Sequence, residues 1–156
     1  MRKKITEREK EPEAAGEEEW LDLETLASVE VGSEDSAHPV ERALTPDVGK
    51  GGWLAGKPGP QTIRILFDEP QKLSRMRLVF ESNEERFQEF VLRWKPGEGP
   101  AREIVRQQYN FSSSGATREV EDYRVNLNGV AELELEINPD KNGAGAFASL
   151  AEWRVR

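Results

Sequence analysis

At Glu132-Leu-Glu-Leu-Glu-Ile137 the chain alternates acidic and aliphatic side chains. Successive side chains of a β-strand point to opposite faces of its sheet, so this period of two predicts a strand with its aliphatic side chains in a core. The three glutamates are expected on the solvent face, where opposite charges on neighbouring strands would stabilise the sheet. The arginines available to pair with them are Arg64, Arg75, Arg77 and Arg93.

The same alternation recurs along the chain on both sides of this stretch. It is clearest over residues 62–67, 75–80, 90–95, 105–111 and 123–127. The segments between these runs favour turns; they include 68–70 and Asn128-Gly129, the strongest hairpin signal. About eight short strands without a long helical period predict an all-β protein, a sandwich of two sheets. One helical turn is expected over 36–44, with Ser36 as its N-cap.

Length, charge and composition limit what the protein can be. A chain of 156 residues has room for one domain with a core and a tail. A net charge of -8 at pH 7 argues against nucleic acid as a partner, because an acidic protein and a phosphate backbone repel each other. The chain has no cysteine, which excludes disulfides and thiolate metal sites. No apolar run approaches the ~20 residues of a membrane helix, so membrane insertion is not expected.

The N-terminal segment differs in character from the rest of the chain. Residues 1–19 are almost all charged or small, and such a segment buries too little apolar area to offset the entropy of ordering it. We therefore predict a charged flexible tail over 1–19 and a domain over 20–156 that begins near Trp20. The basic residues near the N-terminus are not followed by the hydrophobic stretch of a signal peptide, so a cytoplasmic location is expected.

Glu152 stands out in the closing segment of the chain, 147–156, because its neighbours Leu150, Ala151 and Trp153 are apolar. A buried carboxylate is costly unless a cation, an arginine or a set of backbone N–H groups pairs with it. The closing strand therefore needs a partner for Glu152 from another part of the chain.

Five short motifs follow one another between Leu26 and Arg156. They are Ala27-Ser-Val-Glu-Val-Gly-Ser-Glu-Asp-Ser36, Val40-Glu-Arg-Ala-Leu44, Thr45-Pro-Asp47, Gly52-Trp53 and Ala148-Ser-Leu-Ala-Glu-Trp-Arg-Val155. Together they resemble the discoidin family, also called the coagulation factor V/VIII type C family. The resemblance implies an eight-stranded jelly-roll β-sandwich of the galactose-binding-like type. It also implies a non-catalytic protein, not an enzyme, that binds carbohydrate, phospholipid or protein through loops at one end of the sandwich.

The resemblance further implies a structural calcium site. In many members of this family the loop after the first helical turn wraps a calcium ion, and a Glu near the end of the domain completes its ligands. Here the carbonyl ligands would come from Leu44 and Gly49. The side chains of Asp47 and Glu152 would complete an all-oxygen set, which suits calcium. Two alternatives stay open: Lys50 could place its ammonium group there, or loop amides could hydrogen-bond to Glu152.

A saccharide site needs an exposed aromatic side chain against the sugar ring and fixed polar groups that read its hydroxyls. The loops that offer such groups include 82–87 and 138–147. The candidate ligand-binding residues are Arg86, Tyr109, Asn110, Phe147 and His38. Large aromatic residues are more often core than sugar platforms, and we assign Trp53, Trp94 and Trp153 to the core.

Three functions are compatible with these features. The preferred one is a carbohydrate-binding module, and the alternative is a cytoplasmic protein-interaction module for which the charged tail would be a docking segment. The third is an enzyme. With one His and no Cys the chain lacks the parts of zinc or nucleophilic chemistry, so an enzyme is not predicted.

Overall fold

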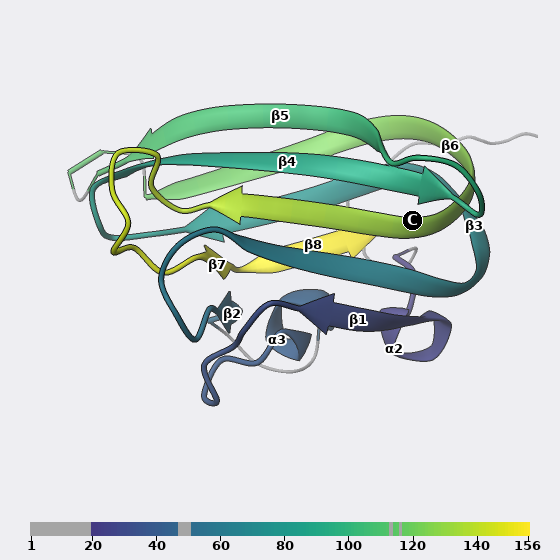
Figure 1. Ribbon diagram of the computed structural model, residues 1–156, viewed down its shortest axis with the longest axis horizontal. Helices are drawn as coiled ribbons and strands as arrows, with labels where there is room; N and C mark the ends of the chain where they lie inside the picture. The colour runs from purple at the N-terminus through teal and green to yellow at the C-terminus, as the bar shows by residue number, and fades with distance from the viewer. Residues whose placement is uncertain (1–19, 47–50, 113, 116) are drawn as a thin grey trace, which may run out of the picture.

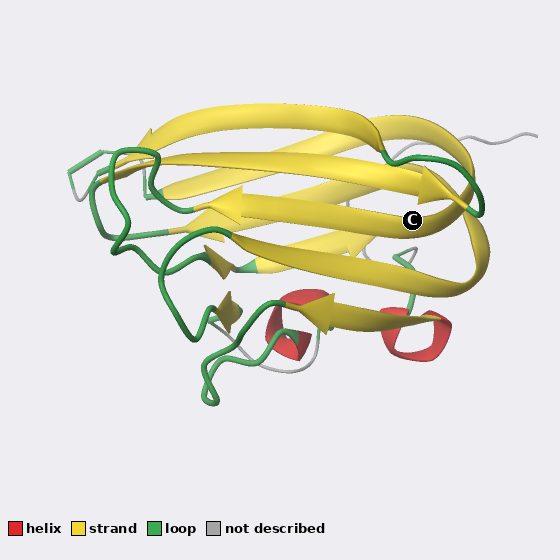
Figure 2. Ribbon diagram, viewed as in Figure 1, coloured by secondary structure: helices red, strands yellow, loops and turns green. Residues whose placement is uncertain are grey.

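The computed structural model describes residues 20–46, 51–112, 114–115 and 117–156. The predicted tail over 1–19 lies outside them. In the described ranges the chain forms eight strands and two one-turn helices, so the protein is all-β as predicted (Figure 2). In chain order these are α2 (Leu23–Leu26), β1 (Ala27–Val31), α3 (Glu41–Leu44), β2 (Trp53–Leu54), β3 (Gln61–Glu81), β4 (Arg86–Pro96), β5 (Arg102–Phe111), β6 (Arg118–Asn138), β7 (Ser149–Leu150) and β8 (Glu152–Val155).

Two layers arise because the long antiparallel pair β3 and β6 changes its outer partners halfway along. The first half of β3 pairs with β1, and the second half of β6 pairs with β4, which pairs with β5. The second half of β3 pairs instead with β8. Figure 1 shows the result, with β1, β4 and β5 in the front layer and β8 behind. The predicted jelly-roll sandwich is confirmed.

Two of the predicted turns are bends inside long strands. The hairpin predicted at Asn128-Gly129 is wrong, because β6 continues through these residues to Asn138. The turn predicted at 68–70 lies within β3, where the pairing with β6 shifts register between Leu66 and Gln71. Gly129 has a φ of +70°, which glycine adopts without a steric penalty. An irregular pairing with a permissive glycine bends and twists a strand without reversing it, and this bend carries both strands from one layer to the other.

The predicted N-cap at Ser36 is also wrong, because α3 begins at Glu41 and its N-cap is Val40. The preceding residues close a tight turn of their own, in which the carboxylate of Asp35 accepts a hydrogen bond from Ala37 N at 3.1 Å. The N–H of Val40 then donates a hydrogen bond to Glu34 Oε1 at 2.9 Å. Local hydrogen bonds of this kind compete with helix formation and delay the helix start.

The core fills the space between the layers. Leu133, Leu135 and Ile137 are fully buried, as the alternation predicted, and they share one cluster with Met76 and Trp153 of the other layer. Trp53 is also buried, and Trp94 packs against the cluster while partly exposed. The three core assignments of the tryptophans are thus consistent with the structure. Among the described residues no helix is long and apolar enough to cross a membrane.

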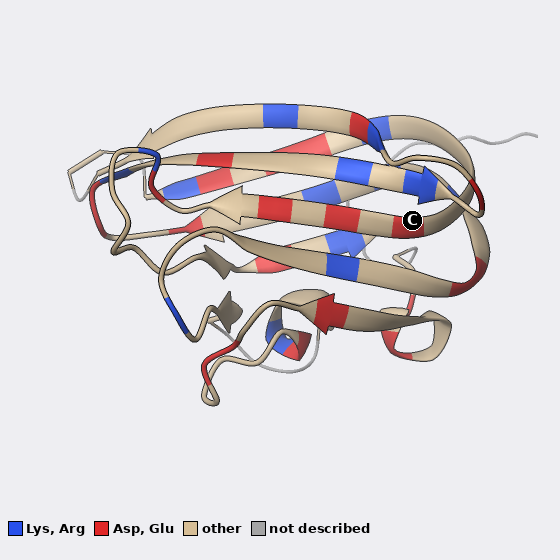
Figure 3. Ribbon diagram, viewed as in Figure 1, with Lys and Arg blue, Asp and Glu red and all other residues tan. Residues whose placement is uncertain are grey.

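Ion pairs cover the outer face of the front layer, where blue and red positions alternate between neighbouring strands (Figure 3). Arg93 Nη1 lies 3.0 Å from carboxylate oxygens of both Glu134 and Glu136, and Arg64 Nε lies 3.7 Å from Glu132. These pairings were predicted. The other two candidate partners, Arg75 and Arg77, lie past the bend of β3 and face Asp122, at 2.7 and 3.8 Å.

Candidate functional site

A hollow of about 520 Å³ lies at the end of the sandwich where β3 leads into β4 and the chain enters β7. Figure 1 shows this end of the sandwich on the left. Its lining combines one exposed aromatic ring with several polar side chains. The lining residues are Leu54, Ser82, Asn83, Glu84, Arg86, Gly145, Phe147 and Ser149. Two of the five predicted ligand-binding residues, Arg86 and Phe147, are therefore brought together although they lie 61 positions apart in the chain.

Arg86 holds one wall of the hollow in place. Its side chain is buried, at 8% exposure, and its Nη1 donates to the carbonyl of Phe147 at 3.1 Å. Its Nη2 is 3.4 Å from both Gln88 Oε1 and Ser149 Oγ, and its guanidinium lies over the ring of Phe111. Burial lowers the pKa of Arg86, but the neighbouring oxygens keep the charged form in place. Arg86 thus ties the segment before β7 to β4.

Phe147 presents its ring to solvent from a fixed backbone. The side chain is 40% exposed, although the next residue, Ala148, is fully buried. Backbone hydrogen bonds hold it on both sides, from Gly59 N to Ala146 O at 3.0 Å and from Ala55 N to Ala148 O at 2.8 Å. An exposed ring on a rigid backbone binds a ligand without a large ordering cost.

Tyr109 and Asn110 lie elsewhere. Tyr109 packs behind the hollow in an aromatic cluster, 5.2 Å between ring centroids from Phe111, and its hydroxyl accepts a hydrogen bond from Gln88 Nε2 at 3.1 Å. Gln88 is buried and also accepts from Arg86, so Tyr109 supports the wall of the hollow indirectly. Asn110 is exposed on β5, opposite Phe87 in the register, outside the described lining.

The burial of the tyrosines predicts an abnormal alkaline titration. Burial raises the pKa of Tyr109 well above its ordinary value of 10.0, and burial with a hydrogen bond to Glu121 raises that of Tyr123. These are the two tyrosines of the chain. In an ultraviolet titration of tyrosinate we expect little ionisation of the native protein at pH 10, where the urea-unfolded chain is about half ionised. Because the folded pKa is raised, this contribution to stability is complete below pH 10 and is lost as the pH rises further. Native and unfolded curves that coincide would contradict the assignment.

His38 lies beside the hollow, and the backbone of Leu54 connects the two. The N–H of Leu54 donates to the carbonyl of His38 at 3.2 Å, and the N–H of Asp35 donates to the carbonyl of Leu54 at 2.8 Å. His38 Nδ1 is 2.9 Å from Asp35 Oδ2, and this hydrogen bond is the largest cause of the lowered pKa of Asp35. With Nδ1 engaged in this way, the carboxylate fixes the orientation of the imidazole ring.

The predicted metal ligands are only partly within the described residues. Asp47 and Gly49 lie outside them. Leu44 is buried and lines a different cavity. The carboxylate of Glu152 faces two arginines, with one oxygen 3.7 Å from Arg77 Nε and 3.5 Å from Arg154 Nε. Within the described ranges no group of three or more His, Cys, Asp or Glu side chains could hold a metal ion. The sequence predicted that Glu152 needs a cation, an arginine or a set of backbone N–H groups as its partner, and an arginine is one of these three.

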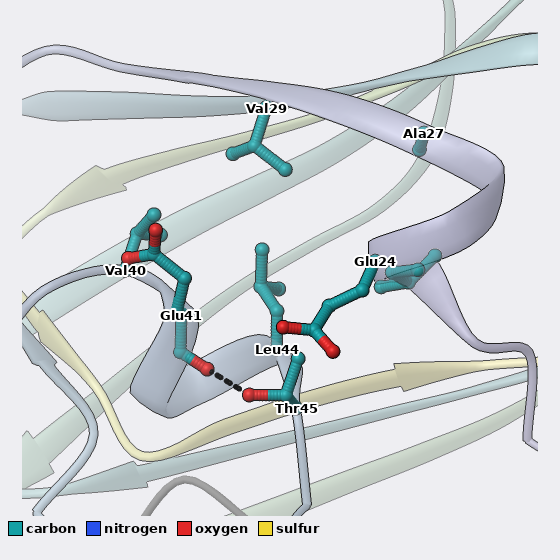
Figure 4. Close-up of a pocket in the computed structure, with 8 residues that line it drawn as sticks. Glu24, Ala27, Val29, Val40, Glu41, Leu44 and Thr45 are labelled. Carbon is teal, nitrogen blue, oxygen red and sulfur yellow. Dashed lines mark hydrogen bonds between the residues drawn. The ribbon is translucent and has the colours of Figure 1, made fainter.

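A second cavity of about 310 Å³ lies between α2, β1 and α3 (Figure 4). Leucine, valine and alanine side chains form most of its lining, and Glu24 and Glu41 also contribute. The hydroxyl of Thr45 donates to the carbonyl of Glu41 at 2.7 Å and closes the last turn of α3. The described lining contains no aromatic ring, so this cavity suits a sugar less well than the hollow at the end of the sandwich.

Comparisons with known proteins show the fold. No protein-family model matches the chain, and no curated protein matches its sequence. Among solved structures, the third CBM32 module of a family 31 glycoside hydrolase from Clostridium perfringens matches with a TM-score of 0.63 and 18% identity, over 90% of this chain and 96% of the module. The CpGH89CBM32-4 module, produced by Clostridium perfringens and solved with GlcNAc-α1,4-galactose, matches with a TM-score of 0.60 and 14% identity, over 88% and 94%. A pectin-binding carbohydrate-binding module matches with a TM-score of 0.57 and 15% identity, over 85% of this chain and 91% of the module. The chain thus shares the jelly-roll β-sandwich fold of these modules.

Two lining residues, Leu54 and Ser149, were not anticipated from the sequence. Both lie in two-residue strands, β2 and β7, which pair with each other. Strands this short leave no alternation to recognise. Ser82, Asn83, Glu84 and Gly145 lie in the two loops that the sequence pointed to.

Proposed function

We propose that the protein is a non-catalytic carbohydrate-binding module related to the discoidin family, and that a saccharide binds in the hollow beside Phe147. The observation that carries the proposal is the exposed ring of Phe147 on a backbone held by hydrogen bonds, at the edge of a hollow with polar side chains. The saccharides named for the similar modules, pectin and GlcNAc-α1,4-galactose, support this class of ligand.

The chemistry of the lining suits a sugar. The ring of Phe147 would cover the apolar face of a pyranose, while the polar groups of Asn83, Glu84 and Ser149 would form hydrogen bonds with its hydroxyls. Arg86 serves mainly as a positioning residue, because both of its Nη nitrogens already donate to protein oxygens. His38, whose carbonyl accepts from the N–H of Leu54, would contact only a ligand that extends past Leu54.

The alternative function, a protein-interaction module, would be favoured by an arginine-rich face open to a partner. On the outer face of the front layer the arginines Arg64 and Arg93 already lie against glutamates. That face therefore offers a partner little uncompensated positive charge. The geometry supports the carbohydrate proposal better.

A saccharide screen tests the proposal. Thermal unfolding is followed with millimolar galactose, N-acetylgalactosamine, GlcNAc-α1,4-galactose and pectin fragments, and a glycan array is probed in parallel. A ligand at 100 times its dissociation constant stabilises the folded state by about 2.7 kcal/mol, so a binding sugar is expected to raise the melting temperature clearly. If no saccharide raises it and the array stays blank, the proposal is wrong.

A further inference from the structure

Arg154 is a charged residue inside the corner where α3 meets β8. Its side chain is 8% exposed, and its Nη1 donates to the carbonyl of Ala43 at 2.8 Å and to that of Trp153 at 3.2 Å. Ala43 is fully buried and lies near the end of α3. Carbonyls at the end of a helix lack an intrahelical donor, so a buried one needs a donor from elsewhere. Arg154 supplies it.

The other edge of the same guanidinium faces a carboxylate. Arg154 Nε is 3.5 Å from Glu152 Oε2, and Arg77 Nε is 3.7 Å from the same oxygen. Arg77 and Arg154 are partners in the register of β3 and β8, so the two positive groups lie on neighbouring strands. Arg154 therefore bridges a helix-end carbonyl and an acidic side chain, which are the kinds of oxygen that a hard cation would bind.

We propose that the guanidinium of Arg154 takes the place in this protein of the structural calcium that the discoidin resemblance implies, and that this corner of the fold is stable without metal. The carboxylate expected to bind calcium already faces two arginines. A divalent ion at Glu152 would lie within a few ångströms of both arginines, where like charges repel. The described ligands thus do not fit a calcium ion.

The test compares thermal unfolding in calcium and in EGTA for the full chain and for Arg154→Met, which keeps an unbranched apolar stem but removes the charge. The wild-type melting temperature is expected to agree between the two buffers within about 1 °C. Arg154→Met should melt roughly 5–10 °C lower in both, because it leaves the buried carbonyl of Ala43 without its donor and removes one of the two arginines that face Glu152. The matched control is Arg118→Met, which removes an exposed arginine 3.1 Å from Glu81 and should change the melting temperature little.

Two results would overturn the proposal. The first is a calcium-dependent rise in the wild-type melting temperature that Glu152→Gln abolishes. The second is an Arg154→Met protein as stable as Arg118→Met. If Arg154→Met does not fold, the wild-type and Glu152→Gln measurements still decide: equal melting temperatures with calcium and EGTA in both proteins support the proposal.

Discussion

Replacing Trp53 by alanine is expected to lower the free energy of unfolding by about 3–5 kcal/mol, the usual cost of truncating a large buried aromatic residue. Trp53 is fully buried, and its Nε1 donates to the carbonyl of Ser33 at 3.0 Å. Its backbone pairs with Leu150 in the register of β2 and β7. The substitution would therefore leave a cavity and also a carbonyl without its donor, next to the strands that line the hollow.

The control for this experiment is Trp20→Ala, which removes the same side chain from the periphery. The ring of Trp20 is partly exposed and lies under the guanidinium groups of Arg75 and Arg156, at 5.1 and 5.7 Å. Exposed contacts of this type contribute about 0.5–1 kcal/mol each, so the loss of both should cost about 1–2 kcal/mol, less than the loss of Trp53. Urea denaturation of both variants measures the difference. Equal costs would show that Trp53 is not the core residue that its burial indicates.

The strand alternation could be read from the sequence because it is a local property. Each strand of a sandwich has one face in the core, so Leu133 and Leu135 had to be buried wherever the strand lay in the sheet. The same face assignment placed Glu134 on the outer face with four candidate arginines, of which Arg93 is the one that lies 3.0 Å away. The burial of these leucines can be predicted without knowing which strands are neighbours. The ion pairs need only the further assumption that neighbouring strands carry opposite charges.

The bends could not be read in the same way. Asn128-Gly129 allows a positive φ in a hairpin and equally in a strand that bends, and the choice depends on the partner strand. Here β3 bends opposite β6, since Gln71 faces Val130 just beyond the register shift. Arg75 and Arg77 pass into the other layer at this bend, which is why they face Asp122 and not the glutamates of residues 132–136.

The candidate site was predicted in part for a related reason. Phe147 and Arg86 have the residue types a saccharide site needs and lie next to turn-rich loops, so the sequence pointed to both. Tyr109 has a suitable type as well, but its strand turns it into the aromatic cluster, where buried Gln88 satisfies its hydroxyl. Which side of an edge strand faces the hollow depends on contacts between segments far apart in the chain.

Replacing Phe147 by alanine is expected to weaken saccharide binding roughly 10- to 100-fold. Burying a phenylalanine side chain contributes about 1.5–3 kcal/mol, and each 1.4 kcal/mol is a factor of ten in affinity. The melting temperature without ligand should change little, because 40% of the ring is exposed and the backbone contacts on both sides of it do not involve the side chain. Isothermal calorimetry with a sugar found in the screen measures the loss.

Two further variants separate contact with the ligand from support of the site. Val120→Ala removes the other large hydrophobic side chain exposed in the described residues, 42% accessible and outside the described lining of the hollow, and should leave affinity unchanged. Arg86→Met should lower both affinity and stability, because the carbonyl of Phe147 loses its donor and the charged anchor between β4 and β7 is gone. If Phe147→Ala loses affinity without a change in stability, the ring contacts the sugar. If Arg86→Met loses both affinity and stability, the arginine holds the ring in position. A Phe147→Ala protein that binds as well as Val120→Ala would place the saccharide elsewhere on the sandwich.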